Sequence, residues 1–251
     1  MYNPFSLKSK TILVTGASSG IGKSIAIQCS KLGANVIITS RSEAKLMQTK
    51  NEMLGLDHQI IVADLTKKND IDNLVMQLPK LDGVVQNAGI SVKRELCNFI
   101  SPSSFNETIA INLEAPIMLQ KSILSNKLLK KESSVVFIAS RAPFSPSIGN
   151  SIYSASKGAI IAYAKVLALE LAHRKIRVNS ICPAMVWTDM ILSGSSITQE
   201  EYKESEMKYP LKRYGNPEDI AYLTIYLLSN ASSWMTGSSI DITGGGEGVL
   251  V

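Results

Sequence analysis

The sequence predicts an α/β fold, a doubly wound parallel sheet with helices on both faces. Short apolar runs alternate with amphipathic stretches along the chain, as in repeated β-α-β units. The apolar runs are rich in Val and Ile and show little polar alternation, which is typical of strands that are covered on both faces. The length of 251 residues suits one large α/β domain, so we expect a single domain over residues 1–251.

Each expected element follows from its own stretch of sequence. The apolar runs predict strands over 11–15, 35–40, 59–63, 83–86, 134–139, 177–182 and 239–242. The amphipathic stretches predict helices over 22–32, 43–54, 67–77, 103–129, 151–173 and 217–230. A polar segment follows the sixth strand. We expect it to form a helical substrate lid, around 188–210, over the carboxyl edge of the sheet, where ligands bind in this architecture.

The composition argues against several classes of function. Two histidines and three isolated cysteines give little material for a zinc site, a disulfide framework or a Ser-His-Asp triad. The net charge of +5 comes without the clustered basic and aromatic residues of a nucleic-acid-binding surface. The first ten residues lack the apolar core of a signal peptide, and no run reaches the roughly 18 apolar residues of a membrane span. We therefore expect a cytoplasmic protein with no metal and no nucleic-acid or membrane partner.

A glycine-rich turn joins the first strand to the first helix. It reads Thr15-Gly16-Ala17-Ser18-Ser19-Gly20-Ile21-Gly22. The glycines allow a tight turn and close approach of a ligand, and the amides of the helix N-terminus face a pyrophosphate. Many such turns are purely structural, but the position between a first strand and a helix favours a dinucleotide site. The hydroxyls of Ser18 and Ser19 are further donors.

The end of the second strand bears on the choice of cofactor. NAD sites usually place an acidic residue here to bind the ribose hydroxyls, whereas this chain has Ser40 and Arg41. Arginine forms charge-assisted hydrogen bonds with a phosphate, so Arg41 fits the 2′-phosphate of NADP(H). The alternative is that Arg41 is a solvated turn residue. We favour NADP(H), because no acidic residue is present to repel the phosphate.

The next two strand ends complete the expected nucleotide site. Asp64, followed by Leu65, can accept a hydrogen bond from the adenine amino group or cap the helix that follows. The run Asn87-Ala88-Gly89 leaves room for a cofactor ribose against the backbone, and it is equally compatible with a plain tight turn.

A tyrosine and a lysine four residues apart carry the strongest indication of catalysis. On a helix, Tyr153 and Lys157 share one face. A lysine ammonium beside a phenol favours the phenolate, so we expect Lys157 to lower the pKa of Tyr153 and make it a useful proton donor. Ser140 lies upstream, at the end of the fifth expected strand.

Together these motifs resemble the short-chain dehydrogenase/reductase family, in the family's order and over nearly the whole chain. The matching residues are Thr15 to Gly22, Asp64, Asn87 to Gly89, Asn112, Ser140, Tyr153, Lys157 and Pro183 to Thr188. The resemblance implies a Rossmann-type sheet of about seven strands and hydride transfer between a nicotinamide and an alcohol or carbonyl.

The resemblance also implies roles for individual residues. Ser140 polarises the carbonyl, Tyr153 donates the proton, and Lys157 binds the nicotinamide ribose. Asn112 is the fourth catalytic residue and holds a water that relays protons to Lys157. The segment from Pro183 through Val186 faces the carboxamide, and Thr188 contacts the pyrophosphate.

Within this family the chain is most similar to bacterial 3-oxoacyl-[acyl-carrier-protein] reductases, through 210–221, 232–237 and 240–245. That likeness implies a role in fatty acid biosynthesis, a homotetramer, and contact with acyl carrier protein through Lys131 and Arg174. The alternative for these two residues is a solvated basic helix end, which the helix dipole favours. One alternative function is a dehydrogenase or reductase of a sugar, polyol, steroid or other small alcohol or ketone. Another is a non-catalytic nucleotide-binding partner protein.

Two loops depart from the family's pattern. Lys93, Arg94 and Glu95 follow the fourth expected strand, and the bulky segment 141–146 follows Ser140 where small residues are usual. We expect both loops to flank the substrate pocket, so they bear on which carbonyl is reduced rather than on hydride transfer.

Overall fold

The computed structural model describes residues 2–91, 94–189, 191 and 198–246. Within these ranges the chain forms a seven-stranded sheet in the order β3-β2-β1-β4-β5-β6-β7, and every neighbouring pair is parallel. The strands are β1 (Thr11–Thr15), β2 (Asn35–Ser40), β3 (Gln59–Val62), β4 (Leu81–Gln86), β5 (Leu129–Ile138), β6 (Arg177–Pro183) and β7 (Ser239–Ile242). The predicted α/β class and doubly wound topology are confirmed.

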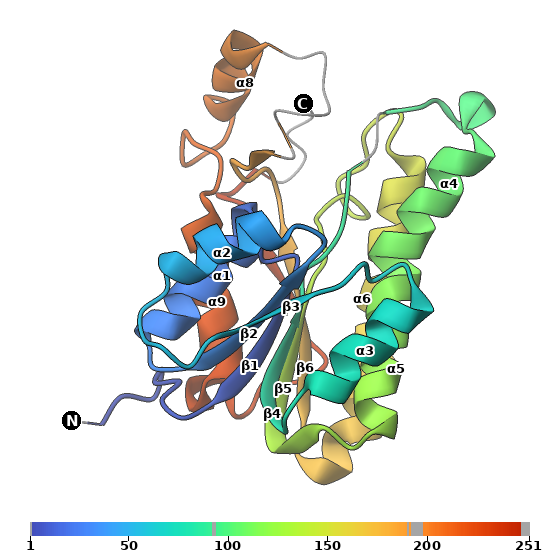
Figure 1. Ribbon diagram of the computed structural model, residues 1–251. Helices are drawn as coiled ribbons and strands as arrows, with labels where there is room; N and C mark the ends of the chain where they lie inside the picture. The colour runs from blue at the N-terminus through green and yellow to red at the C-terminus, as the bar shows by residue number, and fades with distance from the viewer. Residues whose placement is uncertain (1, 92–93, 190, 192–197, 247–251) are drawn as a thin grey trace.

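Helices cover both faces of the sheet (Figure 1). One layer contains α1 (Gly20–Lys31), α2 (Glu43–Asn51) and α9 (Pro217–Leu228). The other contains α3 (Lys68–Gln77), α4 (Pro102–Ile109), α5 (Ala115–Ser125) and α6 (Ser151–Leu171). Each layer has its own apolar core, because side chains alternate between the faces of each strand: Leu13 packs in one core and Ile12 and Val14 in the other.

The remaining elements are short. Three 3₁₀ turns are η1 (Cys97–Phe99), η3 (Ala172–Arg174) and η4 (Asn230–Ser232). Helix α8 (Gln199–Glu206) lies beyond the carboxyl edge of the sheet, at the top of Figure 1. It begins with a capping box, in which the Thr198 hydroxyl accepts from Glu201 N and the Glu201 carboxylate accepts from Thr198 N.

The prediction of one helix over 103–129 is wrong. The structure has α4, then a π-helical segment η2 (Ala110–Glu114), then α5, and Leu129 already begins β5. Pro116 explains the interruption, because its ring clashes with the carbonyl four residues earlier, that of Asn112, and it donates no hydrogen bond. The Ala115 amide instead donates to Ala110 O, five residues back, which widens the helix at Asn112.

Helix α6 is the longest helix among the described residues, with 21 residues. With η3 it forms a stretch, Ser151–Arg174, that is long and apolar enough to span a membrane by length and composition. In this structure its apolar face packs on the sheet, where Ile160, Ala164 and Leu167 are buried. The apolar composition of α6 therefore serves the core, and the helix presents Tyr153 and Lys157 from its first two turns.

Candidate active site

The carboxyl ends of β1 to β6 open into one cleft of about 1400 Å³. Nearly all the predicted site residues line it: Gly16, Ser18, Ser19, Gly20, Ile21, Ser40, Arg41, Asp64, Leu65, Asn87, Ala88, Gly89, Ser140, Tyr153, Lys157, Pro183, Val186 and Thr188. Gly22 and Asn112 lie behind the lining residues and are buried. A parallel sheet causes this convergence, because all its strands end at the same edge.

Hydrogen bonds connect the glycine turn after β1 to the turn after β4. Thr15 Oγ1 accepts hydrogen bonds from Asn87 N at 2.9 Å and from Ala88 N at 3.0 Å. In return, Asn87 Nδ2 donates to Thr15 O at 2.9 Å and to Gly16 O at 3.3 Å. The sequence motif includes Thr15 but predicted no role for its side chain, although a polar residue at the end of an apolar strand is a signal that could have identified one.

The same turn requires glycine at positions 16 and 22. Gly16 has φ +64°, a left-handed conformation that glycine adopts without strain. A Cβ on Gly22 would lie 2.3 Å from Gly16 O and 2.4 Å from Asn87 Nδ2, so no side chain fits. The Ser19 side chain makes no cap hydrogen bond at the start of α1, and the first turn has no acidic residue. These are the features of a pyrophosphate cradle, and the turn fits a dinucleotide.

The adenosine end of the cleft is basic on one side. The side contains Ser40, Arg41, Ser42 and Lys45. Arg41 is exposed, and Ser42 caps α2 by accepting a 3.5 Å hydrogen bond from Lys45 N. Lys45 was not predicted, because one lysine in the first turn of a helix gives no distinctive signal.

Asp64 faces this basic side. Partial burial alone would raise the pKa of Asp64, but hydrogen bonds from Thr66 and the charges of Lys67 and Arg41 outweigh it and hold the pKa below its usual value. The alternative that Asp64 caps the following helix is wrong, because α3 begins at Lys68 and its N-cap is Lys67. Asp64 Oδ1 instead accepts from Thr66 N at 3.1 Å and from Thr66 Oγ1 at 2.7 Å.

The structure brings Ser140, Tyr153 and Lys157 together at the other end of the cleft. Ser140 Oγ accepts from Ala142 N at 3.1 Å and hydrogen-bonds the Tyr153 side chain. Lys157 Nζ lies 5.8 Å from the centre of the Tyr153 ring and donates to Ile138 O at 3.0 Å. Thr188 lies against the glycine turn, where a Cβ on Gly20 would be 3.1 Å from Thr188 Cγ2.

Burial dominates the protonation of this group. It raises the pKa of Tyr153, and the hydrogen bond with Ser140 opposes that rise. The sequence predicted that Lys157 lowers the pKa of Tyr153, but burial controls this pKa and raises it. Lys157 is 6% exposed, and burial lowers the pKa of its ammonium to about 8 while the nearby Cys182 thiol opposes this. Tyr153 consequently keeps its proton at neutral pH and is available as an acid.

Asn112 is buried next to the site and hydrogen-bonds its backbone. The π-helical segment aims its amide at the turn after β4, where Oδ1 accepts from Ile90 N at 2.8 Å and Nδ2 donates to Ile90 O at 3.0 Å. Nδ2 also lies 3.3 Å from Ser156 Oγ, which donates to Tyr153 O at 2.8 Å. A Cβ on Gly89 would be 2.9 Å from Asn112 Oδ1 and 3.4 Å from Lys157 Nζ, so both head groups approach this turn closely.

The segment beyond β6 brings aromatic side chains to the cleft. Tyr202 from α8 and Tyr209 line it, and they pack with Trp187 and Tyr214 in a separate cluster. Trp187 Nε1 donates to Glu206 Oε1 at 2.6 Å, which ties α8 to the segment after β6. Part of the predicted lid, residues 190 and 192–197, lies outside the described residues.

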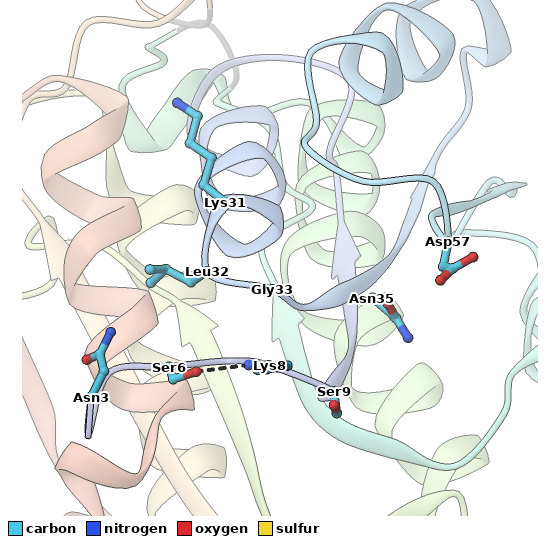
Figure 2. A pocket seen from close by; sticks show the side chains of 9 residues that line it. All are labelled: Asn3, Ser6, Lys8, Ser9, Lys31, Leu32, Gly33, Asn35 and Asp57. Atoms are coloured by element: carbon cyan, nitrogen blue, oxygen red, sulfur yellow. Dashed lines mark hydrogen bonds between the residues drawn. The ribbon is translucent and has the colours of Figure 1, made fainter. Parts of the chain in front are cut away.

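A second hollow of about 670 Å³ lies at the opposite, amino edge of the sheet (Figure 2). Residues before β1 and β3, and residues at and before the start of β2, form it: Asn3, Ser6, Lys8, Ser9, Lys31, Leu32, Gly33, Asn35 and Asp57. None of the predicted site residues lines it. Among the residues that the structure describes, no three His, Cys, Asp or Glu side chains form a group able to hold a metal ion.

Comparison with known proteins identifies the relatives of this chain. Residues 16–247 match the family model described as Enoyl-(Acyl carrier protein) reductase. The chain is 36% identical over 239 residues to the 3-oxoacyl-[acyl-carrier-protein] reductase of Rickettsia bellii, covering 95% of this chain and 97% of that protein. It is 34% identical over 247 residues to the L-xylulose reductase of Caenorhabditis elegans, covering 96% and 97%.

A solved structure is similar over the whole fold. It is the 3-ketoacyl-(acyl-carrier-protein) reductase of Brucella melitensis in complex with NADH, with a TM-score of 0.85 and 28% identity. The match covers 97% of this chain and 100% of that chain.

Substituting Gly22 tests the glycine turn. We expect Gly22→Ala to weaken dinucleotide binding at least tenfold and to lower the free energy of unfolding by about 1–3 kcal/mol, because the new methyl group overlaps Gly16 O and Asn87 Nδ2. Isothermal titration with NADPH and urea unfolding measure the two effects. Gly158→Ala is the matched control, since its Cβ would meet Pro143 at 3.6 Å, an ordinary contact. Equal behaviour of the two variants would contradict the steric argument.

The buried ammonium predicts a pH-dependent stability. The pKa of Lys157 is about 8 in the folded chain and near 10.5 when unfolded, so between these values the unfolded chain binds more protons and stability rises with pH. Below pH 8 Lys157 is protonated in both the folded and the unfolded chain, so burial of its ammonium lowers the free energy of unfolding by the full amount, about 3 kcal/mol. We expect Lys157→Met to lack this rise and to be more stable than wild type at pH 7. Urea unfolding at pH 7, 9 and 10 measures the stability of both proteins. The same pH dependence in wild type and Lys157→Met would contradict the lowered pKa of Lys157.

Proposed function

The chain belongs to the short-chain dehydrogenase/reductase family, and we propose that it is an NADPH-dependent reductase that converts a carbonyl to an alcohol. The observation that carries this proposal is the grouping of Ser140, Tyr153 and Lys157 in the same cleft as the glycine turn. A nucleotide cradle alone fits many binding proteins. A buried phenol beside a hydroxyl and an ammonium is what proton transfer to a carbonyl oxygen requires.

The residues divide the chemistry between them. NADPH, when bound, supplies the hydride. The Ser140 hydroxyl donates a hydrogen bond to the carbonyl oxygen and polarises it. Tyr153 gives that oxygen its proton, and the positive charge of Lys157 stabilises the phenolate that remains. Asn112 Oδ1 accepts a hydrogen bond from Ile90 N, and an amide oxygen has two lone pairs, so we propose that it also binds a water that passes protons to Lys157.

The same residues suit distinct parts of the cofactor. The turn from Gly16 to Gly22, with Ser18, Ser19 and Thr188, holds the pyrophosphate. Asp64 and Leu65 border the adenine, and Asn87, Ala88 and Gly89 border a ribose. Lys157 binds the nicotinamide ribose, and Pro183 and Val186 face the carboxamide.

We favour NADP(H) because of the basic side of the adenosine end. Arg41 and Lys45 line it, Ser40 and Ser42 add hydroxyl groups, and no acidic residue ends β2. The Brucella relative was solved with NADH, which concerns that protein. In this chain a 2′-phosphate gains charge-assisted hydrogen bonds that a bare ribose does not.

Two classes of substrate have support. The names of the Rickettsia and Brucella relatives favour a 3-oxoacyl-[acyl-carrier-protein] and a role in fatty acid biosynthesis, with Lys131 and Arg174 as contacts for the acidic carrier. However, both residues lie at the amino edge, and β5 places Lys131 roughly 30 Å from Ser140. Arg174 also donates to Leu129 O. A small polar alcohol or ketone is the second candidate, favoured by the L-xylulose reductase relative and by the polar loops at the substrate end.

Exposed apolar side chains bear on how the protein assembles into an oligomer. Apolar side chains remain exposed on the outer helices, including Met118 on α5 and Val166 and Leu169 on α6, and Trp234 before β7 is 98% exposed. Such patches favour subunit contacts, so we propose a homotetramer that uses these helices and the C-terminal strand. We place the protein in the cytoplasm. We also propose that the segment around 188–210 is the substrate lid, because Tyr202 and Tyr209 from its described part line the cleft.

Reversing the charge at Arg41 tests the cofactor assignment. We expect Arg41→Asp to raise the KM for NADPH about tenfold to a hundredfold, because it removes a charge-assisted hydrogen bond, and to spare or improve use of NADH. Steady-state kinetics with both cofactors measure the preference. Lys8→Asp, at the far edge of the sheet, makes the same change in net charge and serves as the control. An unchanged preference in Arg41→Asp would contradict the assignment.

Removing the phenol hydroxyl tests the proton donor. We expect Tyr153→Phe to lower kcat at least a hundredfold while NADPH affinity stays within a few-fold of wild type, because general acid catalysis typically contributes 10²–10⁴. NADPH oxidation with a panel of ketones, sugars and acetoacetyl thioesters measures turnover, and NADPH fluorescence measures binding. Retained turnover would show that Tyr153 is not the donor. Tight NADPH binding without turnover on any carbonyl in wild type would favour a non-catalytic nucleotide-binding protein.

A further inference from the structure

One carboxylate oxygen binds both sides of a short β-bridge beyond the sheet. The bridge pairs Val186 with Gly215, and Trp187 N donates to Gly215 O at 2.8 Å. Glu206, at the end of helix α8, accepts at Oε1 from Trp187 Nε1 at 2.6 Å and from Tyr214 N at 3.0 Å. The carboxylate thus connects α8 to the segment after β6 and to the segment before α9.

Trp187 stands between two residues of the cleft wall. Val186 and Thr188 line the cleft. The Trp187 ring packs against the aromatic cluster, with its centroid 5.3 Å from that of Tyr214. Thr188 in turn lies against the glycine turn, where a Cβ on Gly20 would be 3.1 Å from Thr188 Cγ2. A displacement of the indole would move both neighbours, because they share its backbone.

The hydrogen bonds of the Glu206 side chain lead away from its own helix. The first turn of α8 is closed by the capping box of Thr198 and Glu201, and at the other end Met207 N donates to Lys203 O. A carboxylate accepts stronger hydrogen bonds than a neutral group does, and more so where water is partly excluded, as at this half-buried side chain. Its carboxylate therefore fixes segments outside the helix.

We propose that Glu206 is a positioning residue, which acts through Trp187 to hold Val186 and Thr188 against the bound cofactor. This inference rests on the proposed function, in which Thr188 holds the pyrophosphate and Val186 faces the carboxamide. Hydrogen bonds that fix a supporting residue limit how far its neighbours can shift from the binding geometry. The catalytic group comes from the loop after β5 and from α6, so loss of the Glu206 contact reduces cofactor affinity more than the rate of the chemical step.

Substitutions at Glu206 in the full chain test this role. We expect Glu206→Ala to raise the Kd for NADPH about tenfold, as for lost hydrogen bonds to a charged group, and to leave kcat at saturating cofactor within about threefold of wild type. Glu206→Gln keeps an oxygen acceptor and should bring the Kd back to within about threefold. Isothermal titration measures the Kd, and NADPH oxidation measures kcat. Glu204→Ala removes the same charge from an exposed position on α8 and should leave the Kd unchanged.

The indole supplies a second readout. Trp187 and Trp234 are the two tryptophans of the chain, so in a Trp234→Phe background the fluorescence reports Trp187 alone. Quenching of that fluorescence by acrylamide should increase in Glu206→Ala and stay as in the background protein in Glu206→Gln. Trp187→Phe removes the Nε1 donor and should also raise the Kd for NADPH. Because the two residues share one hydrogen bond, the double variant Trp187→Phe/Glu206→Ala should bind NADPH no more weakly than Glu206→Ala alone.

The outcomes separate this inference from the function on which it rests. An unchanged Kd in Glu206→Ala would show that the contact is only structural and overturn the proposal, and an equal rise in Glu204→Ala would assign the effect to net charge and overturn it too. Circular dichroism melting checks folding. If Glu206→Ala does not fold, an unchanged Kd in Trp187→Phe overturns the proposal equally. Wild type that binds NADPH but reduces no carbonyl would overturn the reductase assignment alone, since the Kd needs no turnover, and wild type that binds no NADPH would overturn both.

Discussion

The hydrogen bonds between the turn after β1 and the turn after β4 support the rest of the site. The Thr15 side chain accepts from the backbone amides of Asn87 and Ala88, and the Asn87 side chain donates to the backbone carbonyls of Thr15 and Gly16. β1 and β4 are the neighbours at which the chain reverses its direction of winding, so their turns diverge and open the cleft. These bonds join the glycine cradle to the turn that approaches Asn112 and Lys157.

A costly arrangement of charge lies at the other end of the cleft. A lysine ammonium that is 6% exposed has lost most of its hydration, and the lowered pKa of Lys157, about 8, measures this loss. The Ile138 carbonyl compensates in part by accepting a hydrogen bond. The same burial raises the pKa of Tyr153, so the phenol and the ammonium both hold their protons near neutral pH. A protonated phenol is what the proposed carbonyl reduction requires.

The parts of the molecule that could be predicted from sequence depend on short-range patterns. Strand positions followed from runs of Val and Ile, and the cradle followed from glycines at fixed spacing, because each signal lies within a few residues. The π-helical segment was missed, although Pro116 marks it, because the consequence of that proline appears four residues earlier at Asn112. The start of β5 was missed because Lys130, Lys131 and Glu132 are exposed and carry no apolar signal. The protonation of Tyr153 depends on burial, which helix spacing does not reveal.

The two halves of the cleft accordingly differ in what determines them. The cofactor half consists of strand ends and tight turns, and its geometry is set by the sheet itself. The substrate half consists of loops that are positioned by distant partners: Arg141 by Asp241 on β7, Arg94 through the contact of its neighbour with Gly149, and α8 through Trp187 and Glu206. A change in any of these partners can move a loop at this end of the cleft without disturbing the turns of the cofactor half. Relatives with similar identity to this chain are named for a 3-oxoacyl-[acyl-carrier-protein] in one case and for L-xylulose in another, so the substrate must be inferred from the loops of this chain.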